Sequence, residues 1–106
     1  MADNKANETT SGRCLCGQVQ YEIHGARGIV NCHCSKCRKF HSNYGAYTSV
    51  KTENLTITEK TGLKWFKSPT DETANVHRGF CSACGSSLFW HPQDQPYIAI
   101  AAGSLD

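Results

Sequence analysis

Seven cysteines, gathered in three short clusters, constrain this chain more than any other feature. The clusters are "CLCG" with Cys14 and Cys16, "CHCSKC" with Cys32, Cys34 and Cys37, and "CSACG" with Cys81 and Cys84. An odd number of cysteines cannot all pair as disulfides, and the polar start of the chain has no apolar secretory segment. We therefore expect a reducing, cytoplasmic location, where clustered cysteines are typical of metal ligands or catalytic groups.

The third cluster carries the strongest local signature. Zinc–sulfur bonds of ~2.3 Å at tetrahedral angles place two ligand sulfurs roughly 3.8 Å apart, a distance that a C-x-x-C turn can meet. Gly85 follows Cys84 and can adopt a positive φ, which lets backbone amides point at the sulfurs. The pattern predicts a zinc knuckle that supplies two ligands. Ser86 and Ser87 are candidates to hydrogen-bond to its sulfurs.

The first cluster can supply the other two ligands. On a straight strand the side chains of Cys14 and Cys16 would lie about 6.5 Å apart on one face. Gly17 permits a turn that brings them together. The two pairs then form a four-cysteine structural zinc site that staples the first strand to a late hairpin. In the alternative, Cys14 and Cys16 are small buried residues, and the third cluster recruits ligands from the middle one.

The four-cysteine assignment leaves Cys32, Cys34 and Cys37 without a fourth cysteine. Three protein ligands with an open position are typical of a catalytic zinc, whereas four closed ligands are structural. Three alternatives stay open: a Cys34–Cys37 disulfide in an oxidised sample, a closed site in which His41 reaches back as fourth ligand, and a redox-sensing thiol cluster that releases zinc under peroxide.

Outside the clusters, apolar residues recur at every second position. Val19, Tyr21 and Ile23 alternate with polar residues, as do Leu55 and Ile57. Such alternation, rich in β-branched and aromatic residues, predicts half-buried strands. The candidate strands cover residues 19–23, 54–60, 63–66, 75–80, 87–90 and 97–101, and only residues 35–40 could form a helical turn. The sequence therefore predicts an all-β fold of six or seven strands.

The length of 106 residues suits one domain. Residues 1–11 are polar and are interpreted as a disordered lead-in, so that residues 12–106 form a single zinc-binding domain. The formal net charge is only +2, without a basic stripe of the kind that binds nucleic acid. No apolar run approaches the ~18 residues of a membrane span. We expect neither nucleic acid nor membrane as a partner.

Four segments in order resemble one known family. They are "GRCLCGQVQYEI", "CHCSKCRK", "RGFCSACGSSLFW" and the terminal "AGSLD". Together they resemble the glutathione-dependent formaldehyde-activating enzyme family, which includes centromere protein V, over about residues 12 to 106. The chain departs from the family at Ser42, where relatives usually have Gly.

This resemblance implies a β-tent fold of twisted antiparallel sheets, related to the Rab-exchange-factor fold, with two zinc ions. By motif position, Cys14, Cys16, Cys81 and Cys84 correspond to the structural site, and Cys32, Cys34 and Cys37 to the catalytic one. The implied activity is the condensation of formaldehyde with glutathione to S-hydroxymethylglutathione. It is a carbon–sulfur lyase activity, because the reverse reaction cleaves that bond. The rival hypothesis is a non-catalytic zinc module that binds a protein.

Residues near the clusters are candidates for substrate binding. Arg78, in "HRGFC", is a candidate carboxylate clamp or tuning charge for the site, because a guanidinium can bind a carboxylate bidentately. The plainer interpretation is an ion pair at a strand end or on the surface. Trp65, Phe66, Tyr44 and Tyr47 are candidates to line a pocket, although core packing is the commoner role of a tryptophan such as Trp65.

Overall fold

The computed structural model describes residues 8–68 and 75–106, and this part of the chain is nearly all β. The strands are β1 (Thr9–Arg13), β2 (Gln20–His24), β3 (Val30–Cys32), β4 (Gly45–Lys51), β5 (Leu55–Glu59), β6 (Leu63–Lys67), β7 (Val76–Cys81), β8 (Ser87–Pro92) and β9 (Tyr97–Ala101). One α-helix, α2 (Ser35–His41), and two 3₁₀ turns, η1 (Thr52–Asn54) and η2 (Ala102–Ser104), complete the described elements. The prediction of an all-β fold with one helical turn is confirmed.

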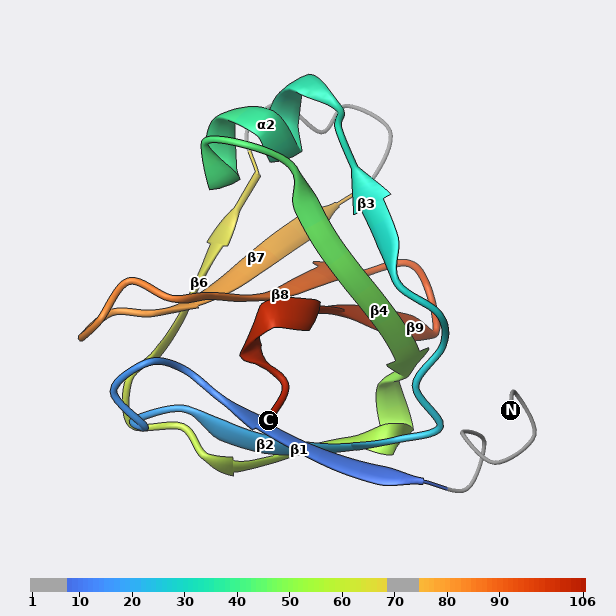
Figure 1. The fold of residues 1–106 in the computed structure, drawn as a ribbon, viewed down its shortest axis with the longest axis vertical. Coiled ribbons are helices and arrows are strands. Elements are labelled where there is room, and N and C mark those ends of the chain that lie inside the picture. Colours follow the sequence, from blue (N-terminus) through green and yellow to red (C-terminus); the bar gives the residue numbers. More distant parts are fainter. Residues whose placement is uncertain (1–7, 69–74) are drawn as a thin grey trace.

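The strands form two antiparallel sheets. The smaller sheet has the order β1-β2-β5, and the larger has the order β3-β4-β9-β8-β7-β6. Figure 1 shows the smaller sheet as a base, with the larger sheet rising from it and α2 at the opposite end. An isolated bridge between Gly12 and Leu105 ties the end of the chain to β1. Twisted antiparallel sheets are also what the family resemblance implies.

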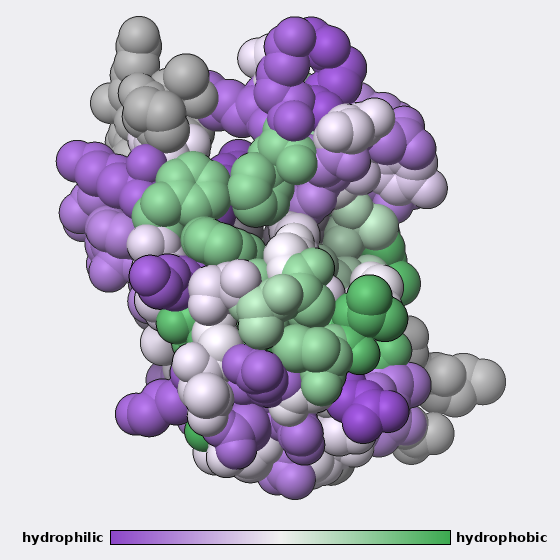
Figure 2. All heavy atoms as spheres, turned by 90° about the vertical axis from the view of Figure 1, so that its left-hand side faces the viewer, coloured by the Kyte–Doolittle hydropathy of each residue, from purple (hydrophilic) through white to green (hydrophobic). Residues whose placement is uncertain are grey.

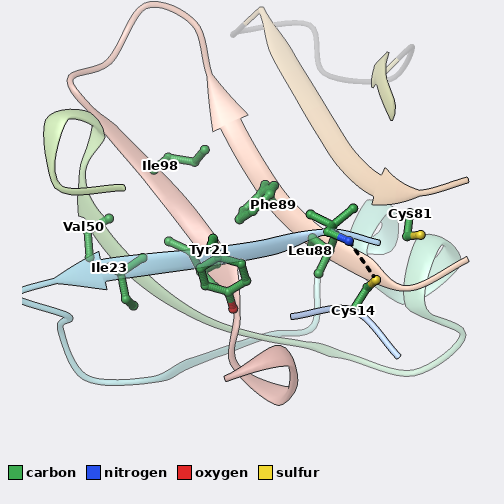
Figure 3. Packing of buried hydrophobic residues seen from close by; sticks show 10 residues of the cluster. Cys14, Tyr21, Ile23, Val50, Cys81, Leu88, Phe89 and Ile98 are labelled. Carbon is green, nitrogen blue, oxygen red and sulfur yellow. Dashed lines mark hydrogen bonds between the residues drawn. The ribbon is translucent and has the colours of Figure 1, made fainter. Parts of the chain in front are cut away.

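The main core lies between the two sheets. In β2 the burial alternates, so that Tyr21 and Ile23 point inward and their neighbours face solvent, as the sequence predicts. Tyr21 packs edge-on against Phe89 of β8, with ring centroids 5.3 Å apart (Figure 3). The buried cluster consists of Cys14, Val19, Tyr21, Ile23, Val50, Cys81, Leu88, Phe89, Ile98 and Ile100. Two cysteines of the predicted four-cysteine site therefore belong to the core itself.

The strand count and the first boundary correct the sequence interpretation. Nine strands are described, rather than six or seven, because three of them, β1, β3 and β4, lack the regular apolar alternation that predicted the others. They form through pairing with neighbouring strands, β1 with β2, β3 with β4, and β4 with β9 as well. β1 already begins at Thr9, within the stretch 1–11 that was interpreted as a disordered lead-in. Its register places Thr9 opposite His24 and Thr10 opposite Ile23. Residues 1–7 of that stretch lie outside the described residues.

The helix α2 begins and ends at residues that suit those positions. Cys34 is its N-cap, and the Cys34 sulfur accepts a hydrogen bond from the Cys37 N–H at 3.4 Å. Ser42 ends the helix with φ of 62°, in the left-handed region that usually favours glycine. Ser42 thus ends the helix in the conformation that a glycine would adopt more easily. Among the described residues, no helix combines the length and apolar character needed to cross a membrane.

A glycine at the junction of the sheets provides a first prediction. A Cβ on Gly12 would overlap the ring and hydroxyl of buried Tyr21 and approach the Ser104 carbonyl to 2.8 Å. The Tyr21 hydroxyl is also hydrogen-bonded to Ser104 Oγ at 2.5 Å, so the ring cannot move freely. We expect Gly12→Ala to lower the unfolding free energy by ~1–3 kcal/mol through overpacking.

Thermal denaturation measures this effect, and the expected fall in Tm is roughly 5–20 °C. Gly103→Ala is the matched control, because a Cβ at Gly103 would meet no atom within 4 Å. The control is expected to keep the Tm within a few degrees. Equal Tm values for the two variants would contradict the close packing of Gly12 on Tyr21.

Candidate metal centres

The structure brings Cys14, Cys16, Cys81 and Cys84 into one cluster, with all four sulfurs within 4.8 Å of one another. The Cys16 sulfur lies 3.7 Å from the sulfurs of both Cys14 and Cys81. These separations match the roughly 3.8 Å expected of sulfurs that share one tetrahedral zinc. The cluster could therefore hold a metal ion with a closed set of four ligands.

Two turns build this four-cysteine cluster. Cys14 and Cys16 lie in the connection between β1 and β2, whereas Cys81 ends β7 and Cys84 lies in the turn before β8. The glycines that follow the two pairs both have positive φ, 84° at Gly17 and 81° at Gly85, as the sequence predicts. The cluster thus joins the small sheet to the large one. Figure 3 shows the sulfurs of Cys14 and Cys81 at the same end of the core.

Polar groups around the four sulfurs fix their positions. The Val19 N–H donates to the Cys14 sulfur at 3.3 Å, and the Ser86 Oγ lies 3.1 Å from the Cys84 sulfur. The contacts of Ser86 lower the pKa of Cys84 to about 5. The Ser86 hydroxyl also accepts a hydrogen bond from the Leu15 N–H at 3.0 Å, so it connects both turns. Within the described chain, the buried Ser87 hydroxyl makes no hydrogen bond to these sulfurs.

The second cluster contains Cys32, Cys34 and Cys37, whose sulfurs also lie within 4.8 Å of one another. Cys32 ends β3, Cys34 caps α2, and Cys37 lies in the first turn of that helix. The sulfurs of Cys32 and Cys34 are 3.5 Å apart. Cys34 is exposed and Cys37 is buried, so one side of this cluster faces solvent and the other faces protein.

The different surroundings of these thiols affect their pKa values in opposite directions. The hydrogen bond from the Cys37 N–H, the largest cause, lowers the pKa of Cys34 to about 7. Burial raises the pKa of Cys37 to about 12. The exposed Cys34 sulfur therefore ionises more readily than the buried Cys37 sulfur, and a molecule from solvent can reach it directly.

No histidine nitrogen joins the three-cysteine cluster in the described part of the chain. His41, the candidate fourth ligand, instead has its Nε2 hydrogen-bonded to the Tyr47 hydroxyl at 2.6 Å. His33 stacks on Tyr44, with ring centroids 4.9 Å apart. The structure thus gives the closed three-cysteine, one-histidine arrangement no support from either residue. Both cysteines of the suggested Cys34–Cys37 disulfide are free thiols.

A cavity of about 360 Å³ opens at the three-cysteine cluster and is lined by all three of its cysteines. Its walls come from β3, β4, α2, β7, β8 and β9, and include the aromatic residues Tyr47, Trp90 and Tyr97. Lys36 and Arg78 also line it, and none of the described lining residues is acidic. The cavity is large enough for a small molecule and combines apolar walls with positive charge.

Arg78 lines the cavity and contacts residues of α2, and only 2% of its surface is exposed. Its Nη2 lies 4.0 Å from the Cys37 sulfur, and its guanidinium carbon lies 5.0 Å from the centre of the Phe40 ring. Its Nη1 is buried without a hydrogen-bond partner. The plainer sequence interpretation, an ion pair at a strand end or on the surface, is therefore wrong, because Arg78 alternates inward in β7 toward the second cluster.

Tyr47 and His41 form a second polar element beside the cluster. Burial raises the pKa of Tyr47 to about 12, although the positive charge of Arg78 opposes this shift. Burial and the same charge lower the pKa of His41. Both side chains are therefore neutral at pH 7, and a 2.6 Å hydrogen bond joins His41 Nε2 to the Tyr47 hydroxyl. The distance between His41 and Tyr47 along the sequence does not predict this hydrogen bond, because it is the turn from α2 to β4 that brings the two side chains together.

The other aromatic candidates lie elsewhere. Trp65 stacks on Phe89, with ring centroids 5.7 Å apart, and remains 38% exposed. Phe66 contacts both Phe40 and Phe80, with ring centroids 5.6 Å and 6.1 Å away. Figure 2 shows the side of the molecule that lies at the left of Figure 1, where the label of β6 stands, and apolar side chains gather across its middle. Of the four aromatic residues considered as pocket candidates, only Tyr47 lines the cavity at the three-cysteine cluster.

Comparison with known proteins agrees with this geometry. The model of a family described as glutathione-dependent formaldehyde-activating enzyme matches residues 9–106. The fold is similar to the crystal structure of a Rhodobacter sphaeroides protein from structural genomics, with a TM-score of 0.73 and 21% identity. That similarity covers 91% of this chain and 87% of the other. No curated protein matches the chain.

Proposed function

Because this chain belongs to the glutathione-dependent formaldehyde-activating enzyme family, we propose that it condenses formaldehyde with a thiol such as glutathione. The reverse reaction cleaves a carbon–sulfur bond, which makes the enzyme a carbon–sulfur lyase. The observation that carries the proposal is the cavity of about 360 Å³ lined by Cys32, Cys34 and Cys37. A cluster of thiols at the wall of a substrate-sized cavity suits chemistry on a sulfur compound.

Both clusters fit zinc by donor type and by spacing. Thiolates are soft ligands that favour zinc over magnesium or calcium, and the sulfur separations of 3.5 and 3.7 Å lie near the expected value. We assign the structural ion to Cys14, Cys16, Cys81 and Cys84, and the catalytic ion to Cys32, Cys34 and Cys37. When bound at the second site, zinc supplies the positive charge that keeps a substrate thiol deprotonated.

The walls of the cavity favour an anionic thiol. Arg78, a buried guanidinium in the wall, contributes positive charge to the cavity. Glutathione carries two carboxylates, so this field attracts it. Trp90 and Tyr97 provide apolar surface that displaces water from the reacting atoms.

The reaction needs few groups from the protein. The substrate sulfur forms a bond to the carbonyl carbon, the π electrons of the C=O bond move to oxygen, and the proton lost by the thiol finally resides on that oxygen. Holding both reactants in one cavity supplies much of the rate. The Tyr47 hydroxyl lines the cavity and is hydrogen-bonded to His41, so it can hydrogen-bond to the developing alkoxide and deliver its proton.

An exchange measurement tests the proposal against a non-catalytic zinc module. We expect the zinc-loaded protein to carry two zinc ions per chain and to accelerate the interconversion of formaldehyde, glutathione and S-hydroxymethylglutathione at equilibrium. Exchange spectroscopy by NMR measures this rate above the spontaneous background. The rate should saturate with glutathione.

The alternative outcome is equally clear. If the protein holds both zinc ions but shows no saturable rate with glutathione or with other small thiols, the enzymatic assignment is wrong. The same fold would then serve as a binding module. Glutathione diethyl ester, in which both carboxylates are esterified, is the matched comparison substrate for the role of Arg78. Its rate should saturate only at higher concentration.

A further inference from the structure

Arg78 is a buried cation that lacks an anionic partner in the described structure. It is 2% exposed, and no described carboxylate forms an ion pair with it. A guanidinium cannot lose its proton in a protein, so it stays charged wherever it is buried. An uncompensated buried charge destabilises a fold strongly. Some group beside Arg78 must therefore carry negative charge in the working protein.

Among residues 8–68 and 75–106, the surroundings of Arg78 offer one candidate for that charge. Phe40 offers its ring face at 5.0 Å, which is a weak attraction in comparison with an ion pair. The Cys37 sulfur, 4.0 Å from Nη2, is the only described hydrogen-bond acceptor of the guanidinium. Neutral thiols would give Arg78 no compensating charge. Three thiolates around one divalent zinc leave one net negative charge at this position.

We propose that Arg78 is the counter-ion of the site formed by Cys32, Cys34 and Cys37, and that it raises the metal affinity of this site alone. Its charge on β7 offsets the excess negative charge of the three thiolates on β3 and α2 (Figure 1). Arg78 is thus a positioning residue, which acts through the ligands without coordinating the metal. It makes the zinc affinity of a three-ligand site high enough for the site to stay occupied while one coordination position remains open.

Burial distinguishes Arg78 from the neighbouring cation Arg38. Arg38 follows Cys37 directly in the sequence, but its side chain is exposed. Solvent screens an exposed charge, whereas the interaction of a buried one with the site is screened far less. The four-cysteine cluster has no corresponding arginine among the contacts described for its sulfurs; its contacts are the Val19 N–H and the Ser86 hydroxyl.

Competition with a chromophoric chelator tests the inference in the absence of any substrate. We expect Arg78→Met to weaken zinc binding at the three-cysteine site by about 10–100-fold, the usual effect of losing a partner of a metal ligand. Binding at the four-cysteine site should not change. Methionine has similar length and no charge to compensate, so the variant should fold at least as well. Arg38→Met is the matched control and should change zinc affinity by less than about threefold.

Arg78→Lys separates charge from shape. It keeps the positive charge, so its affinity at the three-cysteine site should be closer to wild type than that of Arg78→Met. If Arg78→Met does not fold, Arg78→Lys alone decides: affinity within about tenfold of wild type supports the counter-ion, and a larger loss overturns it. Unchanged affinity in Arg78→Met, or equal weakening of both sites, also overturns it.

This inference rests on the zinc site proposed above, but its test does not depend on turnover. A protein that binds zinc at both sites and fails to act on formaldehyde would refute the proposed activity and leave the role of Arg78 open to the same measurement. Conversely, an active enzyme whose metal affinity is indifferent to residue 78 would refute only the counter-ion. Substitution of Co²⁺ for Zn²⁺ adds a spectroscopic readout, because loss of the arginine should shift the sulfur-to-cobalt absorption band of the second site.

Discussion

Replacing Cys81 by serine is expected to leave the chain largely unfolded at 25 °C. Cys81 is completely buried, and its sulfur lies 3.7 Å from that of Cys16, across the junction between the two sheets. Binding of a structural zinc contributes on the order of 10–16 kcal/mol in small zinc domains, whereas a whole domain is stable by only ~5–15 kcal/mol. Loss of one of four ligands therefore removes a large part of the free energy that keeps the domain folded. Far-UV circular dichroism and zinc content measure the result.

A serine in the other cluster is the matched control for this experiment. Cys34→Ser removes one thiol in the same way, but Cys34 is exposed and lies outside the main core. We expect it to keep a cooperative thermal transition within about 10 °C of wild type, because serine is also a good N-cap. A Cys81→Ser protein that loses zinc but keeps the wild-type Tm would show that the four-cysteine cluster does not hold the sheets together.

The local geometry of the two cysteine clusters could be predicted from the sequence because few backbone conformations produce it. A C-x-x-C turn followed by Gly needs positive φ at the glycine, and Gly85 has a φ of 81°. The meeting of Cys14 and Cys16 with Cys81 and Cys84 was predicted from counting thiols, which leaves few ways to complete a tetrahedral site. Alternation likewise identified the buried face of β2. In each case the information lies in a few neighbouring residues.

Features that depend on packing between distant strands could not be predicted. The position of Arg78 under α2 requires the register of β7 against β8, where Arg78 faces Trp90, and a bulge between Gly79 and Phe80 shifts that register. Arginine side chains lie mostly at protein surfaces, which is why an ion pair at a strand end or on the surface is the plainer interpretation of the sequence. The Tyr47–His41 pair depends in the same way on the turn after α2.

Three strands of the structure, β1, β3 and β4, are absent from the sequence prediction, and for the first two the cause is related. β1 and β3 contain few apolar residues, and both lie at an edge of their sheets. Their positions are fixed by backbone hydrogen bonds to β2 and β4, which pattern analysis does not register. The consequence is functional, since β3 carries Cys32 to the cavity and β1 leads into Cys14. Strands with the weakest sequence signals therefore position a ligand in each cluster.

Cys34→Ser is expected to abolish the proposed condensation while the protein stays folded. Cys34 is the exposed member of its cluster, lines the cavity, and lies 3.5 Å from the Cys32 sulfur. Losing one of three ligands should empty the second zinc site and remove several kcal/mol of charge stabilisation. Since each ~1.4 kcal/mol is a factor of ten, we expect kcat/KM for glutathione and formaldehyde to fall by about 10³-fold or more. Exchange NMR measures the rate, and elemental analysis should find one zinc ion per chain.

The choice of serine separates catalysis from folding, because its hydroxyl can still accept the Cys37 N–H that the Cys34 sulfur accepts now. Ser35→Ala, at the neighbouring exposed position, is the matched control and should change kcat/KM by less than about threefold, as surface substitutions usually do. If Cys34→Ser loses one zinc ion yet retains more than a tenth of the wild-type rate, the reaction does not require the three-cysteine site. The catalytic assignment of Cys32, Cys34 and Cys37 would then be wrong, even in a protein that folds normally and keeps its four-cysteine zinc.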